Sequence, residues 1–400
     1  MYFKKLLPVF LSLLFLAVSI VYVSDKPLPV IAQSTQENTT YSVTNEEMRG
    51  VWVTYMTLDV EGESDKEAAF KERIDTIISE MQEASLNTMI VQVRPFCDAI
   101  YPSKHFPWSH ILTGTQGEDP GYDPLQYIID RSHKSGISVH AWINPYRIAT
   151  SETPSQLCDD NPYIRDADIG AEVNGSIYLN PASEGARELI VKGVREITER
   201  YDIDGIQFDD YFYPPDCGDF DKEDYEAYVS KTDSPLSLED FRKENVNQLI
   251  RAVYEAAHKA KENISFGVSP QGNLSNNDGI YADVAKWCTE EGYIDYICPQ
   301  LYYSLDNPAL RFEDALNEWK SLNIADGVRL YIGLPVYKAG TDADSGTWLD
   351  NDDILMTEIK ICRESGVNGF TLYSYDSLHS DEGADEVRNV MNYLTSSPTQ

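Results

Sequence analysis

Apolar residues fall along the chain in short runs, and longer amphipathic stretches separate the runs. The runs are rich in β-branched and aromatic residues, which favour strands. After each run the apolar positions recur at helical spacing. The expected strands cover 49–55, 88–94, 138–144, 205–211, 265–270, 293–302, 328–336 and 368–375. The expected helices cover 66–84, 124–135, 184–200, 238–262, 281–291, 308–321, 352–364 and 382–394.

Several of the expected helices begin at a recognisable cap. Short polar side chains accept a hydrogen bond from the first free N–H groups of a helix and therefore mark its start. Such residues precede four of the helices: Asp65, Asp123 (followed by Pro124), Ser183 and Ser237.

The regular alternation of strand and helix predicts the fold. Strands that alternate with helices pair in parallel through right-handed crossovers. Eight such units follow one another without a break in composition, and no glycine-rich phosphate loop follows the first strand. We therefore expect one closed (β/α)8 barrel over residues 46–396, rather than an open doubly wound sheet. Two loops are long, at 145–183 and 212–237, after the third and fourth strands, and are expected to form walls or lids of a site.

Polar residues in four expected strands share one phase. Side chains alternate between the two faces of a strand, and the outer face of a barrel must be apolar because it packs against helices. The polar set is therefore predicted to point into the barrel and to emerge at its C-terminal mouth, where barrel enzymes carry their chemistry. This set contains Gln92, Arg94, His140, Trp142, Asn144, Gln207, Asp209, Tyr211, Gln300 and Tyr302.

Two adjacent carboxylates end the fourth strand. Glycosidic cleavage needs an acid to protonate the leaving oxygen and a second carboxylate that attacks or activates water. Asp209 is the best-placed carboxylate by phase, as nucleophile or stabiliser. Asp210 is the candidate acid, because repulsion and burial would raise its pKa, although it should face the helices unless a bulge turns it inward. The alternative is that both aspartates cap the following loop.

Other residues of the mouth are predicted to bind substrate. Arg94 could clamp an anionic group or form a structural ion pair, and aromatic rings could stack on sugars or fill the barrel. The further candidates are Trp142, Tyr211, Tyr302, Tyr303 and Tyr373 among aromatics, Gln92, Asn144, Gln207, Gln271 and Gln300 among amides, and Asp98 and Asp376 as reserve carboxylates. The six histidines have no HExxH or paired-ligand spacing, so neither a metal site nor a cofactor is expected.

Charge and the N-terminus restrict partners and location. The chain has 66 acidic and 32 basic residues, a net charge of −34 that disfavours nucleic-acid binding. Within residues 1–32, Lys4 and Lys5 precede an apolar run at 6–23, which indicates a secretory signal or an uncleaved membrane anchor. Polar residues 33–45 are expected to be a linker. The protein is thus predicted to be secreted or part of the cell envelope. A Cys158–Cys217 disulfide is one interpretation of the cysteines, and buried free thiols are the other.

Six segments together resemble a known family over about residues 46 to 380. They are MRGVWVTYM (48–56), NTMIVQVRPFCDAIYPS (87–103), GISVHAWINPYR (136–147), YLNPASEGARELI (178–190), YDIDGIQFDDYFYP (201–214) and YICPQLYYS (296–304). They are similar to the bacterial glycosyl-hydrolase-like family 10. The resemblance implies a barrel glycoside hydrolase acting on a polysaccharide, namely peptidoglycan glycan strands stripped of peptide.

A more distant resemblance constrains the mechanism. Residues 204–211 (DGIQFDDY) resemble the fourth-strand motif of family 18 chitinases, but Tyr211 occupies the place of that family's acid glutamate. The chitinase mechanism is therefore not transferable. A non-catalytic glycan-binding envelope protein, or a lyase or transferase that uses Arg94 and Arg147 on acidic sugars, remains an alternative to the hydrolase. The oligomeric state is left open.

Overall fold

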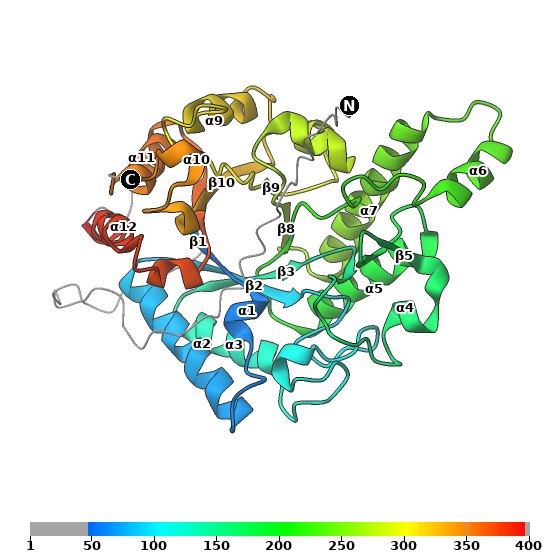
Figure 1. The fold of residues 1–400 in the computed structure, drawn as a ribbon, viewed down its shortest axis with the longest axis horizontal. Coiled ribbons are helices and arrows are strands. Elements are labelled where there is room, and N and C mark those ends of the chain that lie inside the picture. The colour runs from blue at the N-terminus through cyan, green and yellow to red at the C-terminus, as the bar shows by residue number, and fades with distance from the viewer. Residues whose placement is uncertain (1–46, 350, 397–400) are drawn as a thin grey trace, which may run out of the picture.

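The computed structural model describes residues 47–349 and 351–396 (Figure 1). The predictions for the N-terminal signal or anchor (1–32) and for the linker (33–45) lie outside these residues. Within the described ranges, no helix is both long and apolar enough to cross a membrane.

Eight parallel strands close into a barrel, with helices on the outside (Figure 1), so the predicted (β/α)8 fold is confirmed. Each strand pairs with the next strand of the barrel, and β11 pairs with β1 to close it. The strands are β1 (Met48–Val53), β2 (Thr88–Arg94), β3 (Ser138–Ile143), β7 (Gly205–Phe208), β8 (Ser265–Val268), β9 (Tyr296–Ile297), β10 (Arg329–Pro335) and β11 (Gly369–Tyr373).

The main helices follow the strands in the predicted order. They are α2 (Lys66–Glu83), α3 (Pro124–Lys134), α5 (Glu184–Arg200), α7 (Leu238–Ala260), α8 (Val284–Thr289), α9 (Phe312–Lys320), α11 (Ile354–Glu364) and α12 (Ala384–Ser396). The predicted caps are confirmed: Asp65, Asp123, Ser183 and Ser237 each accept a hydrogen bond from an N–H of the first helical turn.

Most of the strands are shorter than predicted. The fourth strand, β7, ends at Phe208 rather than at residue 211, and the sixth, β9, contains two residues. Pro299 has no N–H to give to a ladder, so beyond it only isolated bridges at Gln300 continue the pairing. The predicted helix 281–291 is also reduced to α8, because Tyr281, which ends the 3₁₀ helix η3 (Leu274–Ile280), has a left-handed φ of 57° that cannot continue into a helix.

Most of the smaller elements lie in the loops at the C-terminal ends of the strands. The long loop after β3 folds into a separate antiparallel sheet, and the loop after β7 carries α6, which projects from the barrel (Figure 1). The elements are α1 (Tyr55–Leu58), η1 (His110–Leu112), β4 (Arg147–Ala149), α4 (Pro162–Arg165), η2 (Ala167–Ile169), β5 (Gly170–Val173), β6 (Ser176–Leu179), α6 (Lys222–Ser230), η4 (Val336–Lys338), α10 (Ala343–Gly346) and η5 (Asp376–His379).

Apolar side chains form two cores. The larger core lies between the strands and the helices, and a smaller one fills the inside of the barrel with large rings. Gly267 of β8 shows how tightly the inner core is packed, because a Cβ there would lie 2.2 Å from the ring of Tyr296. The inner core consists of Met48, Trp52, Ile90, Trp142, Tyr296, Cys298 and Tyr331.

The six cysteines are free, so the Cys158–Cys217 disulfide, one of the two interpretations of the cysteines, is wrong. The Cys158 sulfur lies beside Gly117 in the loop after β2, 3.1 Å from where a Cβ of Gly117 would be, whereas Cys217 is buried in the loop after β7. The alternative interpretation, free thiols, holds.

Candidate active site

A cup of about 290 Å³ opens at the C-terminal ends of the strands. Eight of the sixteen residues predicted for the mouth line it, and six of these eight belong to the set that shares one strand phase. The lining residues are Trp52, Trp142, Gln207, Asp209, Asp210, Tyr211, Ser269, Gln300, Tyr302, Tyr337 and Tyr373. Asp209 and Asp210 are the only carboxylates in this lining, within the described part of the chain.

Asp209 follows the end of β7 and has only 3% of its surface exposed. Its Oδ2 accepts hydrogen bonds from Trp142 Nε1 at 3.1 Å and from Asn144 Nδ2. Its Oδ1 accepts a longer bond, 3.3 Å, from the N–H of Tyr211. The carboxyl group is thus held in one orientation by donors from β3 and from its own loop.

Behind Asp209 lies a chain of amide groups. Gln92 on β2 donates through Nε2 to Asn144 Oδ1 at 2.6 Å, and its own Oε1 accepts from the N–H of Tyr55 at 2.9 Å. Arg147 Nη2 donates to the same Asn144 oxygen at 3.2 Å. These contacts fix which way the Asn144 amide points. Gln92 and Asn144 therefore support Asp209 from behind and do not line the cup.

Asp210 also faces the cup, so of the two orientations left open by the sequence the inward one is found. The strand ends at Phe208, and strict alternation no longer applies two residues later. Gln300 Nε2 donates to Asp210 Oδ1 at 3.2 Å and to the carbonyl of Ser269 at 3.1 Å. The Gln271 side chain also lies close enough to Asp210 to lower the pKa of its carboxyl group. Gln271 does not line the cup itself and acts on the site through Asp210.

The two carboxyl groups are both harder to ionise than an ordinary aspartate. Burial, followed by the charge of Asp210, raises the pKa of Asp209 to about 7, although Arg147 and the Trp142 N–H oppose the shift. Burial also raises the pKa of Asp210, against hydrogen bonds from Gln300 and Gln271. Near neutral pH the pair can therefore hold a proton and a negative charge together.

Arg94 does not reach the cup, and its predicted inward phase is wrong. The register of β2 against β3 shifts between Gln92 and Arg94, so Val93 is an extra residue and the alternation is reset. The Arg94 guanidinium stacks on the ring of Phe106 at 3.7 Å and contacts α5 at Gly193. It lies beneath the helices and is not available to a ligand.

The two reserve carboxylates also lie outside the cup. Asp376 accepts hydrogen bonds from the hydroxyl groups of Thr54 and Thr57 at the start of α1. Asp98 is fully buried under the loop after β2, where the N–H of Phe96 and Gln116 Nε2 donate to it, each at 3.2 Å. Tyr303, the remaining aromatic candidate, is half-buried and packs against the outer core.

Four residues around the site were not assigned to it from the sequence. Trp52 lies at the inward phase of β1, so extending the alternation to that strand would have found it. Tyr337 and Ser269 lie just past the ends of their strands, where periodicity carries no signal. Arg147, considered only for acidic substrates, stacks between Phe96 and Tyr211 at 4.6 and 5.4 Å.

The site has the chemical groups for acid–base work on a hydroxyl-rich ligand. It offers two carboxyl groups, amides that hold them, and aromatic rings that can cover the apolar faces of sugars. Among the described residues there is no group of three or more histidine, cysteine, aspartate or glutamate side chains arranged to hold a metal ion.

A family profile described as Glycosyl hydrolase-like 10 matches residues 47–350. The chain is 37% identical over 331 residues to glycosyl hydrolase YngK of Bacillus subtilis (strain 168), over 77% of this chain and 64% of YngK. It therefore spans less than two thirds of that relative. It is 30% identical over 386 residues to glycosyl hydrolase DigH of Escherichia coli (strain K12), over 87% of each chain.

The fold is also similar to solved structures. The glycoside hydrolase domain of PgaB (BpsB) from Bordetella bronchiseptica superposes with a TM-score of 0.57 at 12% identity, over 86% of this chain and 99% of that domain. At this identity the similarity concerns the fold alone.

Proposed function

This chain belongs to the glycosyl hydrolase-like 10 family, and we propose that it hydrolyses glycosidic bonds in a cell-envelope polysaccharide. We propose peptide-free glycan strands of peptidoglycan as the substrate. The observation that carries the proposal is the Asp209–Asp210 pair, two adjacent carboxyl groups with raised pKa values in a cup lined by aromatic rings. Raised pKa values beside a cleft are typical of acid–base catalysts.

Burial favours an order of roles opposite to the one expected from the sequence. Asp209 is the deeper group, and the neighbouring charge of Asp210 helps to raise its pKa to about 7. Asp209 then carries the proton and acts as the general acid toward the leaving oxygen. Asp210, held by Gln300 and Gln271, stays ionised and either attacks the anomeric carbon or activates a water.

The walls of the cup support a sugar ligand. Trp52, Trp142 and Tyr373 present ring surfaces, and Tyr211 and Tyr337 keep 46% and 45% of their surfaces exposed at the cup. Sugar rings stack their C–H faces on such side chains, while their hydroxyl groups need hydrogen-bonding partners like Gln207. The cup therefore suits a pyranose ring. Arg147 beneath Tyr211 leaves the acidic-sugar alternative to be tested.

The test is digestion of purified peptide-free glycan strands, with chitin and starch as comparison polymers and mass spectrometry of the products. Hydrolysis adds one water for each bond cleaved, and we expect it with the glycan strands. Products lighter by one water would instead indicate a lyase. Saturable binding with no product after long incubation would indicate a non-catalytic glycan-binding protein and would refute the hydrolase. The same digestion is carried out with Asp209→Asn, which should release no product. Asp98→Asn is the matched control, because Asp98 is also buried but lies outside the cup.

A further inference from the structure

Three tyrosine rings form one continuous wall of the cup, here called the tyrosine wall: Tyr302, Tyr337 and Tyr373. The ring centroids of Tyr302 and Tyr337 lie 5.9 Å apart, those of Tyr302 and Tyr373 5.8 Å, and those of Tyr337 and Tyr373 6.1 Å. Each ring comes from a different strand end. The relative position of three separate segments therefore decides the shape of this wall.

Regular secondary structure does not hold two of the three rings. β9 ends at Ile297, five residues before Tyr302, and Tyr337 lies on η4, a single 3₁₀ turn. Tyr373 is the last residue of β11 and is held by its ladder. Other contacts must therefore position Tyr302 and Tyr337.

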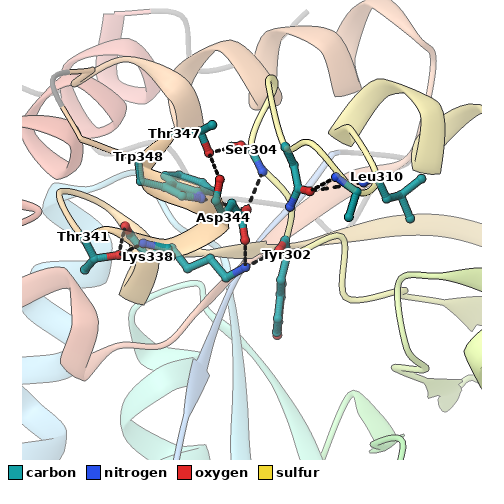
Figure 2. A network of polar contacts seen from close by, with 11 residues as sticks. Tyr302, Ser304, Leu310, Lys338, Thr341, Asp344, Thr347 and Trp348 are labelled. Atoms are coloured by element: carbon teal, nitrogen blue, oxygen red, sulfur yellow. Dashed lines mark hydrogen bonds and ion pairs between the residues drawn. The ribbon is translucent and has the colours of Figure 1, made fainter.

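Those contacts converge on Lys338 and Asp344 (Figure 2). Lys338 follows Tyr337 in the chain, and its Nζ donates to the carbonyl of Tyr302 at 2.7 Å and to Asp344 Oδ1 at 2.7 Å. The ammonium group of Lys338, the residue after Tyr337, thus ties this part of the chain to the main-chain carbonyl of Tyr302. Lys338 keeps 15% of its side chain exposed, and Asp344 9%.

Asp344 in turn anchors the loop that follows Tyr302. Its Oδ2 accepts hydrogen bonds from the N–H of Ser304 and from Trp348 Nε1, each at 3.0 Å (Figure 2). Burial raises the pKa of Asp344, but the hydrogen bonds from Lys338, Trp348 and Ser304 together lower it by more. The pKa of Asp344 therefore lies below its ordinary value. The carboxylate is therefore charged at any physiological pH.

The backbone at Asp344 has an unfavourable conformation, and these hydrogen bonds help to stabilise it. Asp344 and Ser345 have φ of 52° and 64°, in the left-handed region that is unfavourable for residues other than glycine. That conformation turns the Asp344 side chain back toward Ser304 and Lys338.

We propose that Lys338 and Asp344 are positioning residues that fix the tyrosine wall as a binding subsite for a pyranose ring of the substrate. This inference rests on the proposed function for its substrate, but it concerns binding and not the chemical step. Neither residue lines the cup, and each acts through Tyr302 and Tyr337. The expected consequence is selective: the wall contributes to saccharide affinity, while the Asp209–Asp210 pair keeps its geometry.

The test uses Lys338→Met, which keeps the length of the side chain and removes its charge, together with Asp344→Asn. The matched control is Lys261→Met. Lys261 Nζ also donates to one aspartate, Asp202 at 2.6 Å, and to one carbonyl, Ile203 at 2.7 Å, but at the opposite end of the barrel. Binding of peptide-free glycan oligosaccharides is measured by calorimetry in an Asp209→Asn background, and KM and kcat are measured with Asp209 intact.

We expect Lys338→Met to weaken oligosaccharide binding and to raise KM about tenfold. The value of kcat should stay within about threefold of the parent, and the shape of its pH profile should not change. Asp344→Asn should weaken binding and raise KM in the same way. Lys261→Met should change neither the binding of oligosaccharide nor KM. Unchanged binding in Lys338→Met, or a loss confined to kcat, would overturn the proposal.

The design separates this proposal from the proposed function. If the unmodified chain binds oligosaccharides without cleaving them, and Lys338→Met weakens that binding, the hydrolase fails while the subsite stands. If the chain cleaves glycan strands and Lys338→Met binds normally, the subsite fails alone. If the chain neither binds nor cleaves them, both are wrong.

Discussion

Two pairs of buried acidic side chains can be compared in this barrel. Asp209 and Asp210 lie at the mouth, where the cup opens, whereas Glu358 on α11 and Glu386 on α12 are sealed between two helices. Burial is the first cause of a raised pKa in all four groups, and each pair includes a group with a pKa of about 7, Asp209 in one and Glu386 in the other. A raised pKa alone therefore does not separate a candidate site from a structural cluster.

The surroundings of the two pairs differ in the donors that they provide. Trp142 and Asn144 orient Asp209, and Gln300 orients Asp210. Among the described residues, by contrast, neither oxygen of Glu358 has a hydrogen-bond partner, and Glu386 accepts bonds only from the backbone N–H groups of Leu355 and Ile354. A carboxyl group that must act as a base or acid needs a fixed orientation and access to substrate. Only the pair at the mouth has both.

The largest expected effect separates the pairs by activity. Asp209→Asn should lower kcat by about a thousandfold or more, because an amide cannot supply the proton to the leaving oxygen. Glu358→Gln should leave kcat within about twofold. Reducing-end release from glycan strands measures both. Normal activity in Asp209→Asn, with melting unchanged, would remove that residue from the mechanism.

A smaller loss is expected when the support behind Asp209 is removed. Asn144→Ala deletes a donor to Asp209 Oδ2 and leaves Gln92 Nε2 without its acceptor. The Asp209 carboxyl group can then rotate, and kcat should fall about 10- to 100-fold with little change in KM. The control is Asn247→Ala, which removes a buried asparagine that accepts from Trp287 outside the cup. An equal loss in both variants would mean general damage to the fold.

The sealed pair should show itself in stability rather than in activity. The pKa of Glu386 is raised to about 7 in the folded protein, against about 4.3 in an unfolded chain. The folded state therefore holds this proton more tightly, and the stability it contributes is complete below pH 4 and is lost as the pH rises to 7 and above. Glu386→Gln should remove that loss and be more stable than the parent at pH 8 by on the order of 1–3 kcal/mol.

Denaturant unfolding at pH 5 and pH 8 measures this difference. Glu364→Gln, a change at an exposed glutamate of α11, is the control and should follow the parent at both pH values. The parent should lose more stability between pH 5 and pH 8 than Glu386→Gln does. An equal loss in the two chains would contradict the raised pKa of Glu386.

The smallest expected effect sharpens the electrostatics of the mouth. Trp142→Phe keeps an aromatic ring at this position but removes the indole Nε1–H, whose hydrogen bond lowers the pKa of Asp209. The pKa of Asp209 should rise slightly above 7, so the alkaline limb of the kcat profile should move to higher pH, with kcat at its optimum within a few-fold of the parent. Trp319→Phe, which loses a bond to the Gly272 carbonyl away from the cup, should leave the profile unmoved. A shift to lower pH would refute the role of this donor.

The fold was predictable because its signal repeats along the whole chain. Eight apolar runs, each followed by a helical pattern, leave little choice but parallel strands, and capping residues such as Ser183 and Ser237 marked helix starts correctly. The same alternation placed Trp142, Gln207 and Asp209 in the cup. Errors appeared where the alternation breaks: at the bulge before Arg94 and beyond the early end of β7. Irregular backbone at a strand end has no periodic signature.

The order of apolar and polar residues by itself determined the barrel, the mouth, and the presence of Asp209 there, because periodicity depends only on local geometry. Tertiary structure alone decided that Asp210 turns inward, that Arg94 faces the helices, and that the tyrosine wall is tied together through Lys338. These outcomes depend on contacts between segments far apart in the chain. Burial, charge and orientation of a side chain are set by such contacts, and no local pattern encodes them.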